Sequence, residues 1–204
     1  MKHPDTIVMI FSKAPVVGQV KTRLVPYISA EQAARLHAEL THDRLQMCTA
    51  AALCDVELWC SPDSQHPFFI DCVQRYGIRS RTQAGDDLGE RMSNAIRRRL
   101  VHYRKIIIIG ADAPALQSDT LESVIAALDD TEVVLVPAED GGYVLLGTTR
   151  HREGMLASVP WGSESVLAST VRNLERLQLQ HRLVGGCWDV DRPEDLVRYK
   201  ALKM

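Results

Sequence analysis

A basic loop follows the first apolar run of the chain. Lys13, Lys21 and Arg23 fall within eleven residues, and Gly18 lies between them. A phosphate-binding loop needs fixed positive charge and a backbone that permits close approach. The GxxxxGK[ST] spacing of a Walker A loop is absent. The segment indicates phosphate binding, and the alternative is an exposed basic loop that binds nothing.

Aspartates supply a second kind of chemistry in two places. Asp112 follows a run of four isoleucines, and Asp189 and Asp191 lie two residues apart near the C-terminus. Carboxylates at strand ends can give a hard cation such as Mg²⁺ or Mn²⁺ its oxygen ligands. On a strand, Asp189 and Asp191 share one face, so either can be the second ligand beside Asp112. The alternatives are a turn-forming Asp112 and a helix-start role for Asp191.

Two glycine-containing segments could position a substrate. Glu139 and Asp140 precede two glycines, so a carboxylate here can orient an acceptor hydroxyl or remove its proton. The alternative for that segment is a β-turn between two strands. The segment from Gln83 to Met92 combines glycines with a helix start, which suits contacts to a base, ribose or phosphate.

Strands and helices alternate along the whole chain, which predicts βαβ units and a mostly parallel sheet. In such a sheet the ligand lies beyond the carboxyl ends of the strands, where the segments above are found. The expected strands are Thr6–Phe11, Asp55–Cys60, Ile78–Thr82, Lys105–Gly110, Glu132–Val136, Tyr143–Leu146, Arg182–Val184 and Cys187–Val190. The expected helices are Ser29–Leu53, Pro67–Tyr76, Leu88–Leu100, a helix capped by Ser118 that ends near Leu128, Ser163–Leu177, and a terminal helix opened by Pro193. We interpret Arg97, Arg98 and Arg99 as a solvated helix end.

The bulk composition is that of one globular domain, residues 1–204, with a formal net charge of −2. That charge gives no reason to expect nucleic-acid or membrane-surface binding. No apolar run is long enough to span a bilayer and no signal peptide is recognisable, so we expect a cytoplasmic protein. The five cysteines lack CxxC spacing and are expected to be reduced thiols. A homo-oligomer is left open.

These segments, taken in order, resemble the bacterial radical-SAM-associated, or arsenosugar-biosynthesis, glycosyltransferases. The matching pieces are FSKAPVVGQVKTRL, GDDLGERM, GADAPAL, PAEDGGYVLLG, the PW pair before Gly162, and WDVDRPEDL. They extend from residue 11 to about residue 196. The resemblance implies a single-domain α/β fold of the GT-A, nucleotide-diphospho-sugar transferase type, with a mixed, mostly parallel sheet flanked by helices.

The resemblance also implies roles for individual residues. Lys13, Lys21 and Arg23 would contact the phosphates of a nucleotide, and Gly85, Leu88 and Gly89 would lie near that nucleotide. Asp112 would bind a divalent metal, Mg²⁺ or Mn²⁺, that Asp189 or Asp191 completes. Asp140 would face the acceptor. Three positions depart from the family pattern, namely Ala111, Gly162-Ser163 and Arg192, and none of them is an expected metal ligand.

Three functions compete at this point. The first is transfer of a sugar from a nucleotide-diphosphate donor to a small acceptor, with Asp140, Lys21 and Arg23 as the catalytic residues. The second is nucleotidyl transfer, in which an NTP and a small phosphorylated or carboxylated substrate release pyrophosphate. One fold serves both reactions, and the segment EDGGY favours the first. The third is a nucleotide-binding module without activity, which the retained aspartates and cations disfavour.

Overall fold

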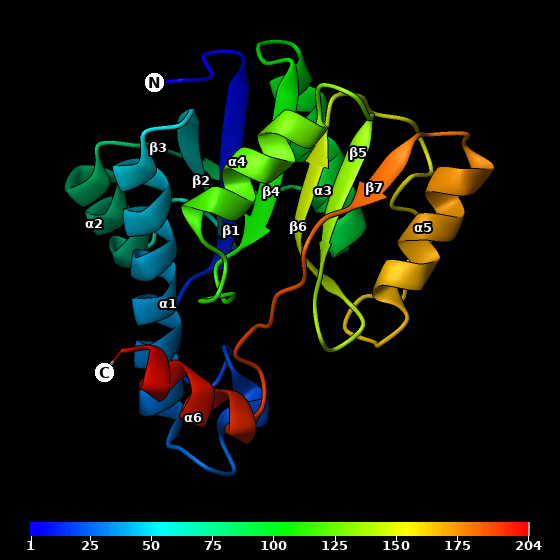
Figure 1. The fold of residues 1–204 in the computed structure, drawn as a ribbon. Coiled ribbons are helices and arrows are strands. Elements are labelled where there is room, and N and C mark those ends of the chain that lie inside the picture. Colours follow the sequence, from blue (N-terminus) through cyan, green and yellow to red (C-terminus); the bar gives the residue numbers. More distant parts are fainter. Residues whose placement is uncertain (204) are drawn as a thin grey trace.

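The computed structural model describes residues 1–203, which form one seven-stranded sheet with helices on both faces (Figure 1). The strands lie in the order β3-β2-β1-β4-β6-β5-β7. Their bounds are β1 Thr6–Lys13, β2 Asp55–Ser61, β3 Arg79–Thr82, β4 Lys105–Gly110, β5 Val133–Pro137, β6 Tyr143–Thr148 and β7 His181–Leu183. All neighbouring pairs are parallel except those of β6, which is antiparallel to both β4 and β5. This is the mixed, mostly parallel sheet that the sequence predicts.

The helices are α1 Ala30–Ala51, α2 Pro67–Tyr76, α3 Leu88–Leu100, α4 Ser118–Ala127, α5 Val166–Arg176 and α6 Pro193–Leu202, and a 3-10 turn, η1, spans Thr22–Leu24. Helices α1, α2 and α4 cover one face of the sheet, and α3 and α5 cover the other. Strand β4 shows why two layers form. Ile107 and Ile109 face the first layer, whereas Ile106 and Ile108 face the second, because successive side chains alternate across a strand.

Local signals in the sequence fix several element ends. Ser29 caps α1 with a full capping box in which Gln32 takes part, and Pro193 is the first residue of α6. Ser118 was expected to cap α4, but Gln117 holds that position and Ser118 is the first helical residue. Residues 187–190 do not form a strand, since only an isolated bridge between Ala138 and Cys187 is present there.

One charged segment is placed differently from the expectation. Arg97 and Arg98 are exposed, but Arg99 is 6% exposed and pairs with the buried Glu57 at 3.2 Å. A charge that is removed from water needs a partner, and Glu57 provides one. The interpretation of all three arginines as a solvated helix end is therefore wrong for Arg99.

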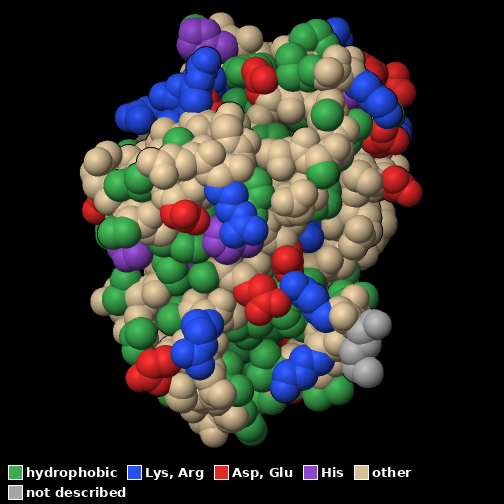
Figure 2. All heavy atoms as spheres, turned by 90° about the vertical axis from the view of Figure 1, so that its left-hand side faces the viewer, with side chains coloured by type: hydrophobic (Ala, Val, Ile, Leu, Met, Phe, Trp, Pro, Cys, Tyr) green, Lys and Arg blue, Asp and Glu red, His purple; other side chains and the backbone are tan. Residues whose placement is uncertain are grey.

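The surface charges, the cysteines and the helices can each be compared with what the composition predicts. Figure 2 shows basic and acidic side chains interspersed over the face that carries α1 and α2. The five cysteines are all buried free thiols. None of the described helices has the length and apolar character that a membrane span requires.

Candidate functional site

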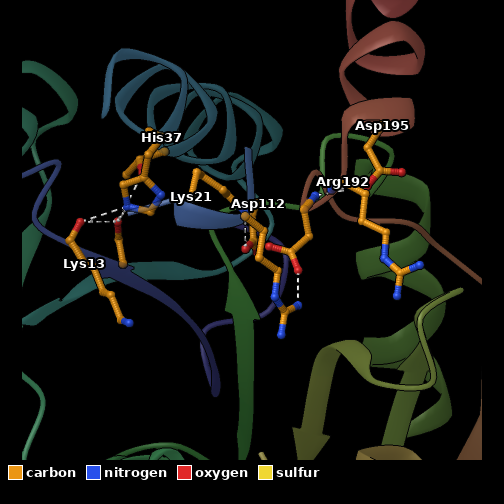
Figure 3. A network of polar contacts seen from close by, with 10 residues as sticks. Lys13, Lys21, His37, Asp112, Arg192 and Asp195 are labelled. Carbon is orange, nitrogen blue, oxygen red and sulfur yellow. Dashed lines mark hydrogen bonds and ion pairs between the residues drawn. The ribbon is translucent and has the colours of Figure 1, made fainter. Parts of the chain in front are cut away.

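The centre of the site is a contact between the basic loop and the end of β4 (Figure 3). Lys21 Nζ donates to Asp112 Oδ2 at 2.8 Å, and the lysine side chain is only 5% exposed. Lys21 has a left-handed backbone, with φ of 49°, which turns the chain into η1. Burial opposes ionisation of Asp112, but the Lys21 ammonium holds the pKa of this carboxyl below its usual value. Asp112 is therefore an ionised, partly exposed carboxylate at a strand end.

Asp189 is the second carboxylate of the site. A main-chain hydrogen bond from Val190 N to Asp112 O, 2.9 Å long, ties this segment to the end of β4. Burial, and then the charges of Asp112 and Asp140, raise the pKa of Asp189 to about 7. Among the described residues, no hydrogen bond or ion pair satisfies its side chain. Asp189 thus adds negative charge beside Asp112 without a cation of its own.

Asp191 lies on the other side of Val190 and has a partner. Its carboxylate forms an ion pair with Arg23, whose second terminal nitrogen lies 3.3 Å from the carbonyl oxygen of Gly162. The sequence left Asp189 and Asp191 as equal candidates for one metal position because both were expected on one strand face. That premise is wrong, since the segment is not a strand. Both residues line the outer rim of the site, but only Asp189 borders the apolar pocket and only Asp191 borders the basic one.

Asp140 stands at the tip of the β5–β6 hairpin. Its Oδ1 accepts a hydrogen bond from Gly142 N at 2.9 Å. Gly141 has φ of 88°, and a Cβ there would lie 2.1 Å from Glu164 O. Glycine is required at that position because a larger residue would collide with the chain that leads into α5. The β-turn interpretation is confirmed. Asp140 also lines the cleft, and its role toward an acceptor stays a prediction.

The cleft at the carboxyl ends of β1 and β4 has three connected parts. The basic lobe, about 550 Å³ in volume, is lined by Lys13, Lys21, Arg23, Gln83, Asp86 and Arg91 among others. The apolar lobe, about 220 Å³, is lined mainly by Phe11, Leu88, Met92, Tyr143, Trp161 and Val166. The outer basin, about 610 Å³, lies over Trp188, Arg192 and Arg198. Asp112 borders the first two parts, and Asp140 and Asp189 border the last two.

The structure distributes the remaining predicted residues unevenly. Lys13 lines the basic lobe, where His37 Nε2 holds its carbonyl at 2.9 Å, and Leu88 lines both the basic and the apolar lobe. Gly18 and Gly85 shape the backbone beside the basic lobe, with φ of 78° and 140°. Gly89 lines neither the basic nor the apolar lobe, and a Cβ there would lie 2.4 Å from Leu156 O and 3.0 Å from the Trp161 ring nitrogen. Gly89 therefore lets α3 pack on the segment before α5, and we do not retain it as a nucleotide contact.

Several lining residues were not singled out from the sequence, although two of them, Gln83 and Arg91, lie in the segment Gln83–Met92 that was expected to contact the nucleotide. Arg91 Nε donates to Gly85 O at 2.9 Å, and Gln83 Nε2 donates to Trp59 O at 2.8 Å. Both side chains line the basic lobe. Arg91 is part of the segment GDDLGERM, so a search of that motif for cations could have found it. No local sequence pattern marks Phe11 or Tyr143 as site residues, because ordinary core residues of strands show the same apolar pattern.

The donor set fits a divalent cation only in part. Among residues 1–203, no group of three or more His, Cys, Asp and Glu side chains is arranged to hold a metal ion. Asp112 and Asp189 offer carboxylate oxygens, and their mutual repulsion would be relieved by a cation. Mg²⁺ commonly takes one or two carboxylates and completes its shell with phosphate oxygens and water. A two-aspartate site that is completed by a bound phosphate is consistent with these residues.

The fold defines the class of protein. It is the nucleotide-diphospho-sugar transferase fold, shared with a candidate nucleotide-diphospho-sugar transferase of Desulfovibrio desulfuricans G20. The TM-score is 0.83 at 27% identity, over 93% of this chain and 83% of that one. A synthetase of CMP-2-keto-3-deoxy-manno-octonic acid, complexed with CTP, has a TM-score of 0.62 at 12% identity over 98% of both chains. A 4-diphosphocytidyl-2C-methyl-D-erythritol synthase of Anaerococcus prevotii has 0.65 at 10% identity, also over 98% of both.

The chain belongs to the bacterial family described as "Uncharacterized protein conserved in bacteria (DUF2064)", whose model matches residues 44–163. The matched range includes Leu88, Asp112 and Asp140, whereas the basic loop and Asp189 lie outside it. No curated protein sequence matches the chain.

Proposed function

We propose that this protein is a transferase that binds a nucleotide-diphosphate sugar and moves the sugar to a small acceptor, with Mg²⁺ or Mn²⁺ as cofactor. One observation carries the proposal. Buried Lys21 reaches Asp112 at 2.8 Å at the junction of a basic lobe and an apolar lobe, beside the unpartnered Asp189. This geometry suits a diphosphate in the basic lobe and a transferred group at the junction.

The side chains of the basic lobe would bind and orient the leaving diphosphate. Lys13, Lys21 and Arg23 supply three cations there, and fixed positive charge stabilises negative charge that develops on a leaving group. A divalent ion held by Asp112 and Asp189 would contribute further charge neutralisation when bound. Arg91 supports the turn at Gly85 from inside the same lobe.

Asp140 is the proposed proton acceptor. Its Oδ1 is held by Gly142 N, and among the described residues Oδ2 has no protein partner. A carboxylate that is fixed through one oxygen can take a proton from an acceptor hydroxyl with the other. The apolar walls beside it would keep bulk water from competing with that hydroxyl.

Nucleotidyl transfer is the second candidate, and the shared fold with a CTP-bound synthetase is the observation that favours it. The four Lys and Arg side chains that line the basic lobe could equally hold a triphosphate. The apolar lobe beside Asp140 favours sugar transfer, because the group that receives the sugar needs room and a base there. The narrower radical-SAM-associated or arsenosugar assignment stays a prediction from the motifs.

The test is a turnover assay with UDP-, GDP-, ADP- and dTDP-sugars and with the four NTPs, each with Mn²⁺, Mg²⁺ or EDTA. We expect metal-dependent release of a nucleoside diphosphate from one sugar donor. Asp112→Asn should abolish this release, and Lys200→Ala, an exposed position on α6, should not change it. Pyrophosphate release from an NTP, with every sugar donor inert, would establish nucleotidyl transfer instead.

A further inference from the structure

The walls of the apolar lobe suit a ring-shaped group. Tyr143 and Trp161 meet edge to face with ring centroids 6.3 Å apart, and Phe11 and Leu88 also line the lobe. Leu88 is 40% exposed, so its side chain is accessible to a group in the lobe. A dry cavity of about 150 Å³ can hold benzene. The lobe, at about 220 Å³, therefore has room for one substituted ring.

These walls are held in place by close backbone contacts. Gly141 packs against the main chain of Glu164, and Gly89 packs against the main chain of Leu156 and the ring of Trp161. Leu167 N also donates to Gly141 O at 3.0 Å. These contacts join the β5–β6 hairpin, α3 and the start of α5 around one space. The lobe is therefore largely formed before a ligand binds.

The charges around the lobe have one sign. The residues that line it include three carboxylates, Asp112, Asp140 and Asp189, and no Lys, Arg or His. The nearest cation is Lys21, which lines the basic lobe and is paired with Asp112 at 2.8 Å. Two further cations are also paired. Arg23 pairs with Asp191 over the basic lobe, and Arg198 pairs with Glu139 through two hydrogen bonds of 2.7 and 3.0 Å. The Asp140 carboxylate has no cationic partner among the described residues, so an anionic group that entered the lobe would be repelled by Asp140 and would find no unpaired cation in the lining.

We infer that the apolar lobe selects the acceptor, and that this acceptor is a small alcohol or amine with an apolar ring and without a phosphate or carboxylate on that ring. The inference rests on the proposed transferase function. It reverses the expectation of a phosphorylated or carboxylated co-substrate that accompanied nucleotidyl transfer. The ring would fill the space between Leu88, Tyr143 and Trp161. Its hydroxyl or amino group would face Asp140 at the mouth of the lobe.

Three probes that share one ring test the inference: 2-phenylethanol, phenethylamine and phenylacetate. Binding is measured by ligand-observed NMR and by calorimetry on the full chain. We expect the alcohol and the amine to bind and phenylacetate to bind at least tenfold more weakly. Equal binding of phenylacetate and the alcohol would overturn the inference, as would binding of none of the three.

Two variants locate the binding. Ser163→Lys places a cation at the mouth of the lobe, at an exposed position, and should raise phenylacetate affinity at least tenfold while lowering that of the amine. Val166→Phe should fill the lobe and abolish binding of all three probes. If Val166→Phe does not fold, Ser163→Lys still decides, since unchanged probe preferences would place the binding elsewhere.

A parallel titration with sugar nucleotides and Mn²⁺ separates this inference from the proposed function. Nucleotide binding without the expected probe preference would refute the acceptor class and leave the transferase proposal standing. Probe binding in the expected order, with no nucleotide bound by the wild type, would refute the transferase proposal while the lobe keeps its ligand class. Ser163 does not line the basic lobe, so Ser163→Lys should leave nucleotide affinity within about twofold of the wild type.

Discussion

Asp189→Asn should stabilise the metal-free protein at neutral pH while removing its response to metal. Burial and the charges of Asp112 and Asp140 raise the pKa of Asp189 to about 7, whereas an unfolded aspartate titrates near ~3.9. A carboxyl whose pKa is raised by folding stabilises the fold below the unfolded pKa. That contribution is lost as the pH rises through the folded pKa. The ionised form is therefore a cost to the fold above about pH 7.

The size of this cost follows from the pKa difference. A difference of about 3 corresponds to at most about 4 kcal/mol, at about 1.4 kcal/mol per pKa unit. Asp189 is only partly buried, so solvent and salt reduce this value, and we expect about 1–2 kcal/mol. For a chain of this length, that gain corresponds to a rise in melting temperature of roughly 2–8 °C. The difference between wild type and variant should shrink as the pH falls from 7 toward ~4, and it should nearly vanish only below the unfolded pKa, where Asp189 is protonated in both the folded and the unfolded state.

The assay is urea denaturation of wild type and variant at pH 5, 6, 7 and 8 in EDTA, repeated with Mg²⁺ or Mn²⁺ and a nucleotide. Asp130→Asn, an exposed carboxylate after α4, is the matched control and should change stability little at any pH. With metal and nucleotide the wild type should gain stability by mass action and the variant should not. An Asp189→Asn protein that is no more stable than the wild type at pH 8 in EDTA would refute the account of three crowded carboxylates.

Three further variants test other parts of the site. Lys21→Met should lower nucleotide affinity, measured by calorimetry, by about tenfold to a hundredfold, because a charge-assisted phosphate contact of ~1.5–3 kcal/mol is lost. Unchanged affinity would exclude Lys21 from the phosphate site. Asp140→Asn, which can keep the hydrogen bond from Gly142, should lower turnover by about 10²–10⁴ at unchanged nucleotide affinity, and full turnover would exclude Asp140 as the base. Gly89→Ala should lower the free energy of unfolding, measured by urea denaturation, by about 1–3 kcal/mol, because the Cβ of the alanine would collide with Leu156 O. An unchanged free energy of unfolding would contradict the packing role given to Gly89.

The fold was readable because its signals are local. Four consecutive isoleucines predict a doubly buried strand, and β4 occupies the predicted range Lys105–Gly110. The spacing of Ser29 and Gln32 fixes the start of α1 in the same way. The reversed direction of β6 follows from the tight turn at Asp140, which leaves room for a hairpin and none for a crossover helix. Where the prediction failed, as for Arg99, a partner distant in sequence decided the outcome, since Glu57 lies on β2.

The candidate site was only partly readable, because its geometry depends on long-range contacts. Asp189 and Asp191 have the same residue type and nearly the same position in the sequence. Val190 separates them by donating to Asp112 O, so one aspartate joins the carboxylates and the other meets Arg23. The types and spacing of residues 189–191 alone do not predict which aspartate has which partner. The choice between the two aspartates required the position of the β4 end and of the basic loop.

Long-range packing also makes the apolar lobe, the proposed acceptor side, the part of the site that the sequence predicts least. Its walls come from β1, β4, α3, the β5–β6 hairpin and the segment that leads into α5, and their apolar side chains resemble core residues in the sequence. Only their convergence beside Asp140 turns Phe11, Leu88 and Trp161 from core positions into a surface that can bind a ligand. Phosphate binding, by contrast, needs charges, which stand out in a sequence wherever they lie. A loop rich in charge and glycine can therefore indicate from the sequence alone that the ligand carries phosphates. The shape of an apolar binding site depends on packing between distant segments, so it can be described only from the folded structure.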